Sequence, residues 1–282
     1  AGIRDRVRTA PVLSYSDLLD QISIAALYEG RGNSGVILAQ IIMGLCEGLG
    51  DKSTLDSSNI STALRIADER AQQSVAEPVT GTMLTVLSDV TKTAIEAESG
   101  IDFSKLIEIL LLKAVTSVDD TPNHLEVLKS ARVVDSGGYG LEIILRALLV
   151  FIENRDPMLT NVVLRKPDGG KPFSEQGIPV FKEQLDGYGY CTQFIIKDST
   201  KDLECLKRDF QRLGDSLVIS GTKDLYRVHL HADDPGIPIS KAATIGSVSE
   251  VKVENIQFDR SVEIQREKEM ERDKQIDLAF QV

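Results

Sequence analysis

The first half of the chain repeats apolar residues at the spacing of amphipathic helices. Between residues 15 and 153, apolar side chains recur three and four positions apart, in stretches separated by short polar segments. Side chains at this spacing share one face of an α-helix. The pattern predicts about seven helices: 15–28, 59–75, 102–118, a short one from Thr121-Pro122-Asn123 through 131, and one after each of three glycine-containing loops. Almost nothing here alternates like a strand, so residues 1–154 are expected to form an all-α domain.

The second half of the chain changes period. Strands are predicted over 190–197, 215–221, 225–232 and 248–256, and helices over 202–213 and 237–245. The order β-α-β-β-α-β is typical of a ferredoxin-like α+β domain, here over 188–257. Residues 155–187 are rich in proline and are expected to be a linker with one short strand at 161–165. Residues 258–282 are a mostly charged extension, expected to be a solvated helix or linker.

Three glycine-containing loops each lead into one of the predicted helices. They span residues 30–35, 76–82 and 134–138. Glycine lets a backbone approach a ligand closely, and a helix N-terminus attracts anions, so a phosphate is the expected ligand. Asn33 or Ser34 is expected to cap the first of these helices. A single loop of this kind is more often a purely structural helix start, but its repetition favours a ligand site. If all three helix starts lie at one end of a bundle, they form a polar pocket over an apolar core.

Two residues of these loops admit two interpretations. Asp135, at a helix start, is placed to meet a ribose, a phosphate-bound metal or a backbone N–H, and it is equally explicable as a plain helix cap. Met83 is able to pack on a flat heterocycle, although a methionine at helical spacing usually belongs to a core. The sequence leaves both alternatives open.

A second candidate site lies in the predicted sheet. His229 and His231 are two residues apart in one strand, so both imidazoles share a face, and Cys191 begins another strand. One thiolate and two imidazoles suit tetrahedral zinc, with water, Asp233 or Asp234 as the fourth ligand. The alternative is a pair of solvent-facing histidines beside a buried cysteine.

Composition narrows the functional class. The net charge of −11 argues against a nucleic-acid-binding protein, because phosphate contacts need clustered Lys and Arg. No transmembrane segment is expected, since no apolar run approaches the ~20 residues that span a bilayer. Three cysteines do not make a disulfide framework, so a reducing, cytoplasmic location is expected.

The loops and the second-half motifs resemble a known family. Residues 31–38 (RGNSGVIL), 77–84 (EPVTGTML) and 133–138 (VVDSGG) are similar to the signature loops of the DhaL domain, the ATP-binding, eight-helix barrel of dihydroxyacetone kinases. Residues 188–192 (YGYCT), 228–231 (VHLH) and 251–256 (VKVENI) resemble the middle domain of the A-type subunits of bacterial fatty acid kinases, a group also called DAK phosphatase. The resemblance covers roughly residues 15–257.

The resemblance implies a site for each cofactor. ATP is expected across the open end of the helical barrel, with Asn33 and Ser34 on the phosphates and Thr82 and Met83 near the adenine. The nucleotide-binding residues that follow from the motifs are Gly32, Asn33, Ser34, Gly35, Thr82, Met83, Asp135, Ser136 and Gly137. Zn²⁺ is expected on Cys191, His229 and His231. The Asp-Gly-Asp-Thr-Gly segment that holds two Mg²⁺ ions in the family has no match here, and truncation is the expected cause.

The function implied is the ATP-binding component of a two-component kinase. It would transfer the γ-phosphate of ATP to a fatty acid carboxylate presented by a separate, DegV-like fatty-acid-binding protein. The alternatives are a dihydroxyacetone-type small-molecule kinase, a nucleotide-binding regulatory module without turnover, and a zinc-stabilised scaffold that binds no nucleotide. A homodimer is one oligomeric state that the sequence leaves open.

Overall fold

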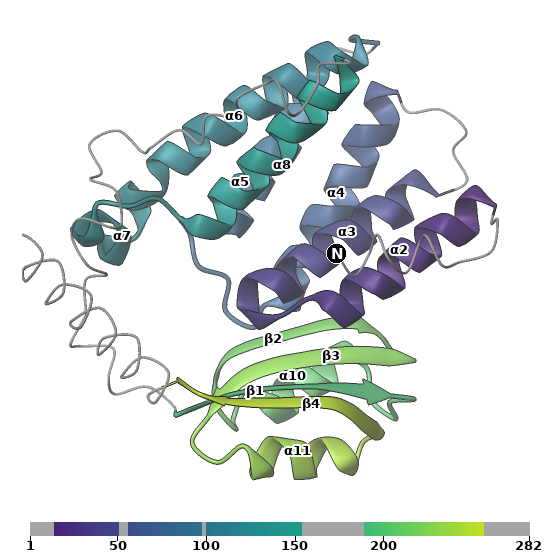
Figure 1. Cartoon of the computed structure of the whole chain (residues 1–282), viewed down its shortest axis with the longest axis vertical. Helices are drawn as coiled ribbons and strands as arrows, with labels where there is room; N and C mark the ends of the chain where they lie inside the picture. Colours follow the sequence, from purple (N-terminus) through teal and green to yellow (C-terminus); the bar gives the residue numbers. More distant parts are fainter. Residues whose placement is uncertain (1–13, 51–55, 98–99, 154–188, 257–282) are drawn as a thin grey trace, which may run out of the picture. The chain divides into compact units, whose positions relative to one another are not determined.

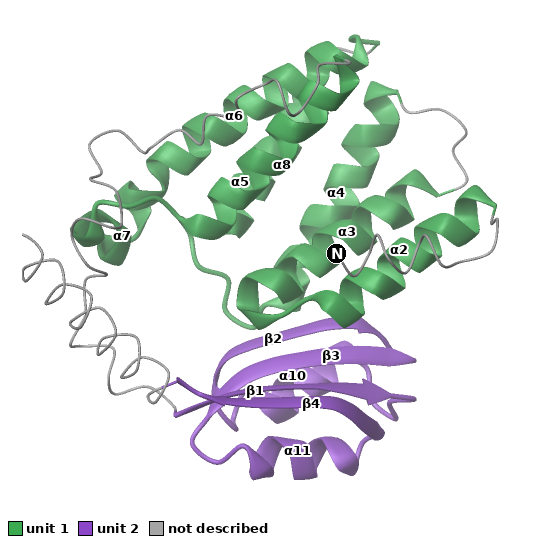
Figure 2. Cartoon of the chain, viewed as in Figure 1, with its two compact units in different colours: residues 1–170 green, residues 171–282 purple. Residues whose placement is uncertain are grey.

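The computed structural model describes residues 14–50, 56–97, 100–153 and 189–256 of the chain. The chain divides into two compact units, residues 1–170 and 171–282 (Figures 1 and 2). The described part of the first unit is helical, and that of the second is a small α+β fold. Both fold classes predicted from the sequence are therefore confirmed. The expected linker at 155–187, its strand at 161–165 and the charged extension at 258–282 lie outside the described residues.

Seven helices are described in unit 1 (Figure 1). They are α2 (Tyr15–Glu29), α3 (Gly32–Leu49), α4 (Ser57–Ser74), α5 (Met83–Glu96), α6 (Phe103–His124), α7 (Glu126–Ala131) and α8 (Ser136–Ile152). The apolar faces of α5 and α6 supply much of the core, and Ile41 of α3, Leu64 of α4 and Leu141 of α8 close it. The helical periodicity of the sequence thus converts directly into one buried cluster.

Helices α3 and α4 pack with their backbones in close contact. A methyl group added at Gly44 would overlap the backbone of Ala67, and one added at Gly48 would overlap the backbone of Ala63. Among the described residues, α3 is the one helix long and apolar enough to cross a membrane, by length and composition only. Its close packing on α4 is the behaviour of a core helix in a globular domain, and length and composition alone are weak support for a span.

Two boundaries in unit 1 differ from the sequence-based prediction. Helix α3 begins at Gly32, with Arg31 at the N-cap and no side-chain capping bond, so the expected cap by Asn33 or Ser34 is wrong. Gly32 has a φ of 62°, which turns the chain into the helix before either residue is reached.

The second difference concerns the proline in α6. No helix starts at Thr121; α6 continues through Pro122 to His124, and the short helix α7 begins at Glu126. Proline has no N–H to donate to the carbonyl of Val118. The Thr121 hydroxyl donates to that carbonyl instead, with 2.7 Å between Oγ1 and O. A side chain thus supplies the missing hydrogen bond, and the helix continues past the proline.

Unit 2 is a four-stranded antiparallel sheet with two helices. Its elements are β1 (Tyr190–Lys197), α10 (Leu203–Phe210), β2 (Asp215–Thr222), β3 (Leu225–Ala232), α11 (Gly236–Ala243) and β4 (Ser247–Asn255). The strand order is β2-β3-β1-β4, and every pairing is antiparallel. This order and the β-α-β-β-α-β sequence of elements confirm the predicted ferredoxin-like arrangement.

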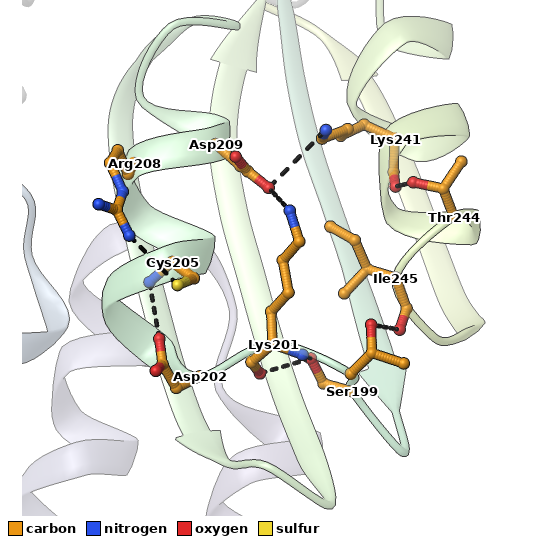
Figure 3. A network of polar contacts seen from close by, with 10 residues as sticks. Ser199, Lys201, Asp202, Cys205, Arg208, Asp209, Lys241, Thr244 and Ile245 are labelled. Atoms are coloured by element: carbon orange, nitrogen blue, oxygen red, sulfur yellow. Dashed lines mark hydrogen bonds and ion pairs between the residues drawn. The ribbon is translucent and has the colours of Figure 1, made fainter.

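Helix α10 packs on the sheet through an aromatic contact and is linked to α11 by charged groups. Phe194 of β1 packs on Phe210 of α10, with ring centroids 5.8 Å apart. The carboxylate of Asp209 on α10 lies between the ammonium groups of Lys201 and Lys241, the latter on α11 (Figure 3). The hydrogen bond from Lys201 holds the pKa of Asp209 below its usual value.

Candidate functional site

The carboxylate of Asp135 joins the starts of α5 and α8. Asp135 is the N-cap of α8, and its Oδ2 accepts the N–H of Gly138 at 2.7 Å. The carboxylate also accepts the backbone N–H groups of Gly137 and of Met83, the first residue of α5. One negative group therefore lies at the positive ends of two helix dipoles. The hydrogen bond to Met83 brings the second and third glycine loops together, and a Cβ added at Gly137 would lie 3.1 Å from the Cβ of Met83.

The hydrogen bonds of Asp135 limit the capacity of its carboxylate to bind a metal ion. Burial raises the pKa of its carboxyl, while the three backbone N–H groups act in the opposite direction. A carboxylate that satisfies three N–H donors has few lone pairs left for a metal ion. Of the two interpretations of Asp135, the structure therefore supports the helix cap, extended across two helices. Its membership of a nucleotide site stays a prediction.

The end of α6 lies against both loops. The backbone N–H of Asp135 donates to Thr121 Oγ1 at 3.0 Å, and Thr121 is fully buried. Gly81 of the second loop has a φ of 87°, and a methyl group added there would lie 2.7 Å from the Cβ of His124 and 3.1 Å from the carbonyl oxygen of Thr121. The last turn of α6 thus holds the second loop through Gly81 and the third loop through Thr121.

The first glycine loop presents polar groups of a different kind. Ser34 is exposed in the first turn of α3. The Oδ1 atom of Asn33 is buried and has no hydrogen-bond partner. A buried acceptor without a donor is costly, so this atom is one that a ligand or a water would satisfy. The first turn of α3 also contains no acidic residue and has no side-chain cap, which leaves its N-terminus attractive to an anion.

The remaining predicted nucleotide-binding residues differ in exposure. Ser136 is exposed and Thr82 is half-buried, whereas Gly137 is buried against the side chain of Met83. Met83 itself is 7% exposed and belongs to the hydrophobic core of unit 1. Its side chain is therefore a core group, and a contact of Met83 with the adenine stays a prediction.

The three predicted zinc ligands lie together on one face of the sheet in unit 2. Cys191 of β1 is directly opposite His231 of β3, and Gln193 is opposite His229. Opposed residues of antiparallel strands point to the same side. Cys191, His229 and His231 each offer a ligand atom within 4.8 Å of the others, and they are the one such group found among the described side chains. Cys191 Sγ is 3.7 Å from Nδ1 of His229.

The electrostatics of this cluster suit a soft divalent metal. His229 is 2% exposed, and burial, which is the largest cause, lowers its pKa to about 4. Its imidazole is therefore neutral near pH 7, as a metal ligand must be. Its Nε2 is buried without a hydrogen-bond partner. Burial raises the pKa of the Cys191 thiol, so a bound metal would have to displace that proton. The sulfur and two nitrogens fit Zn²⁺.

Sequence reasoning missed two neighbours of this cluster. The amide of Gln193 donates to Cys191 Sγ at 3.5 Å, and Asp215 Oδ1 lies 3.4 Å from His231 Nδ1. The expected fourth ligands Asp233 and Asp234 are exposed after β3 and are not part of the metal group, and Asp234 caps the turn by accepting the N–H of Gly236. Asp215 is far away in the sequence and becomes a neighbour only through the pairing of β2 with β3.

Comparison with known proteins identifies both units. The model of the DAK2 domain family matches residues 1–150, and that of the fatty acid kinase (FakA)-like middle domain matches residues 187–261. Uncharacterized proteins of Staphylococcus aureus strains MRSA252, bovine RF122 / ET3-1 and USA300 are each 30% identical over 269 residues, which is 94% of this chain and 49% of each relative. The chain thus spans about half the length of these curated relatives. It belongs to the DAK2 (DhaL) domain family, and a FakA-like middle domain follows the DAK2 domain.

Proposed function

We propose that this chain supplies the ATP-binding part of a two-component kinase, which transfers the γ-phosphate of ATP to a fatty acid carboxylate held by a separate fatty-acid-binding protein. The observation that carries the proposal is the presence of a DAK2 domain and a FakA-like middle domain in one chain, in that order. Use of ATP and the free thiols of the three cysteines make the cytoplasm the proposed location.

The arrangement of the helix starts supports a phosphate at the first loop. The Asp135 carboxylate already occupies the N-termini of α5 and α8. The first turn of α3 has no side-chain capping bond from Arg31 and contains no acidic residue. An anion therefore gains more from the first turn of α3 than from the other two helix starts. We place the phosphates of ATP there, beside Ser34.

Neither Asp135 nor Asp17 presents a carboxylate that is open to magnesium. Asp135 is engaged by three backbone N–H groups, and Asp17 forms a capping box with Ser14 at the start of α2. Phosphoryl transfer draws much of its charge stabilisation from carboxylate-bound Mg²⁺. No catalytic step through magnesium is therefore assigned to these residues, and the proposal for this chain is nucleotide binding.

The binding half of the proposal is tested by titrating the chain with ATP and following calorimetric heat. Ser34→Trp should abolish binding, because an indole in the first turn of α3 fills the phosphate position. Lys105→Trp is the matched control, since Lys105 occupies the corresponding, exposed position in the first turn of α6. Both variants should keep the helical circular dichroism of the parent. Equal ATP affinity in all three proteins would remove the site from the first loop.

The transfer half is tested on the full-length protein. The protein is incubated with γ-labelled ATP and a fatty-acid-loaded binding protein, and the lipid fraction is treated with hydroxylamine, which cleaves acyl phosphates. A labelled, hydroxylamine-sensitive lipid is expected. Label on dihydroxyacetone would instead favour the small-molecule kinase, and ATP binding without any labelled product would favour a regulatory module.

A further inference from the structure

Asp215 and His231 lie opposite each other on adjacent strands. Asp215 is the first residue of β2 and pairs with His231 of β3. Its Oδ1 is 3.4 Å from Nδ1 of the imidazole. An imidazole has two ring nitrogens, and the group that bonds one of them decides which tautomer and orientation the other presents. Since Nδ1 faces Asp215, Nε2 is the nitrogen through which His231 would bind a metal.

The backbone holds Asp215 in this position. A methyl group added at the preceding residue, Gly214, would overlap the carbonyl oxygen of His231, so the backbones of these two segments are in contact here. The register of β2 then shifts between Asp215 and Val218, where Ser216 has a φ of 53°. A bulge of this kind re-aims a side chain at the end of a strand. The carboxylate is therefore placed by main-chain packing and strand register, although the side chain itself is half-exposed.

We propose that Asp215 is a positioning residue of the metal centre in unit 2. It accepts the Nδ1–H of His231 and so fixes the ring with Nε2 toward a metal that Cys191 and His229 also bind. Carboxylate partners of this kind orient a histidine ligand and raise its basicity. Asp215 would act through His231 and would not touch the metal. The inference rests on occupation of the metal centre and is independent of nucleotide binding.

The test measures zinc affinity by competition with a chromophoric chelator, using the whole chain. Asp215→Ala should weaken zinc binding by about 10- to 100-fold, and Asp215→Asn, whose amide oxygen still accepts a hydrogen bond, should weaken it less. Asp233→Ala is the matched control, an exposed aspartate two residues after His231, and should leave the affinity unchanged. An Asp215→Ala affinity equal to that of the parent overturns the proposal.

Cobalt(II) separates a positioning role from direct ligation. At saturation, the visible spectrum of the cobalt-loaded Asp215→Ala variant should match that of the parent, because the set of metal ligands is the same. A spectrum of different intensity and band position would mean that Asp215 is itself a ligand, and the positioning role would be wrong. Far-ultraviolet circular dichroism of each variant checks that the sheet is intact. A parent protein that binds no zinc overturns the metal centre and leaves the nucleotide proposal untouched.

Discussion

The backbone N–H of Asp135 donates a hydrogen bond to the hydroxyl of Thr121, 14 residues earlier in the chain, with 3.0 Å between N and Oγ1. The same hydroxyl donates to the carbonyl of Val118 at 2.7 Å, where Pro122 has no N–H to offer. One buried side chain therefore completes α6 and anchors the third loop. Through Asp135 the effect extends to the start of α5.

Replacing the Thr121 hydroxyl should disturb both the fold and the loops. Thr121→Val leaves the N–H of Asp135 and the carbonyl of the buried Val118 without their partner, which costs about 1–3 kcal/mol of unfolding free energy. Thr121→Ser keeps the hydroxyl and should recover most of that loss together with ATP affinity. Thr116→Val is the control, because the hydroxyl of Thr116 is exposed on the same helix. Urea denaturation and ATP titration are the measurements; a Thr121→Val variant as stable as Thr116→Val would contradict this role.

Gly81 should be intolerant of a side chain for two separable reasons. Gly81→Ala meets both an unfavourable φ of 87° and the Cβ of His124 at 2.7 Å. Gly100→Ala meets a similar φ of 82° with open space around it. The backbone term is about 1–2 kcal/mol and is common to both variants. We expect Gly81→Ala to be the less stable of the two in thermal unfolding, and to be the only one with reduced ATP affinity. Equal losses would show that His124 yields to the added methyl group.

The metal centre predicts the metal content of the purified protein. Protein prepared without a histidine tag should contain about one zinc ion per chain, held by Cys191, His229 and His231. The double variant Cys191→Ser, His231→Ala should lose it, whereas Cys205→Ser, on α10, should retain it. Binding should weaken in acid because the thiol and the imidazoles must be deprotonated. Elemental analysis of the three proteins decides the matter; zinc content that is equal in all of them would exclude this site.

The Asp209 contact should make unit 2 sensitive to acid. Lys201 holds the pKa of Asp209 below its usual value of 3.8, so the carboxylate is more acidic in the folded than in the unfolded state. Its contribution is then present above about pH 4 and is lost as the pH falls through the lower, folded value. Asp209→Asn should reduce stability at pH 7 and make little difference near pH 2. Denaturation of Asp209→Asn and of the exposed control Asp233→Asn at both pH values tests this, and an Asp209 effect independent of pH would contradict it.

The sequence by itself determined the elements and their order. Helical spacing of apolar residues predicted the helices of unit 1, and the change of period predicted the antiparallel sheet of unit 2, because both patterns depend on which face of a local element is buried. The two histidines shared a face for the same reason, since residues two apart in a strand always do. Cys191 joined them because the predicted order of elements pairs β1 with β3.

Tertiary structure decided the contacts made between elements distant in sequence. The helix through Pro122 persists because a threonine hydroxyl replaces a missing N–H, and Asp135 caps a second helix because the start of α5 packs beside it. Asp215 reaches His231 because of one strand register and one bulge, neither of which has a local signature. Such partners depend on how elements pack in three dimensions. The periodicity of the sequence indicates only which face of its own helix or strand each side chain lies on.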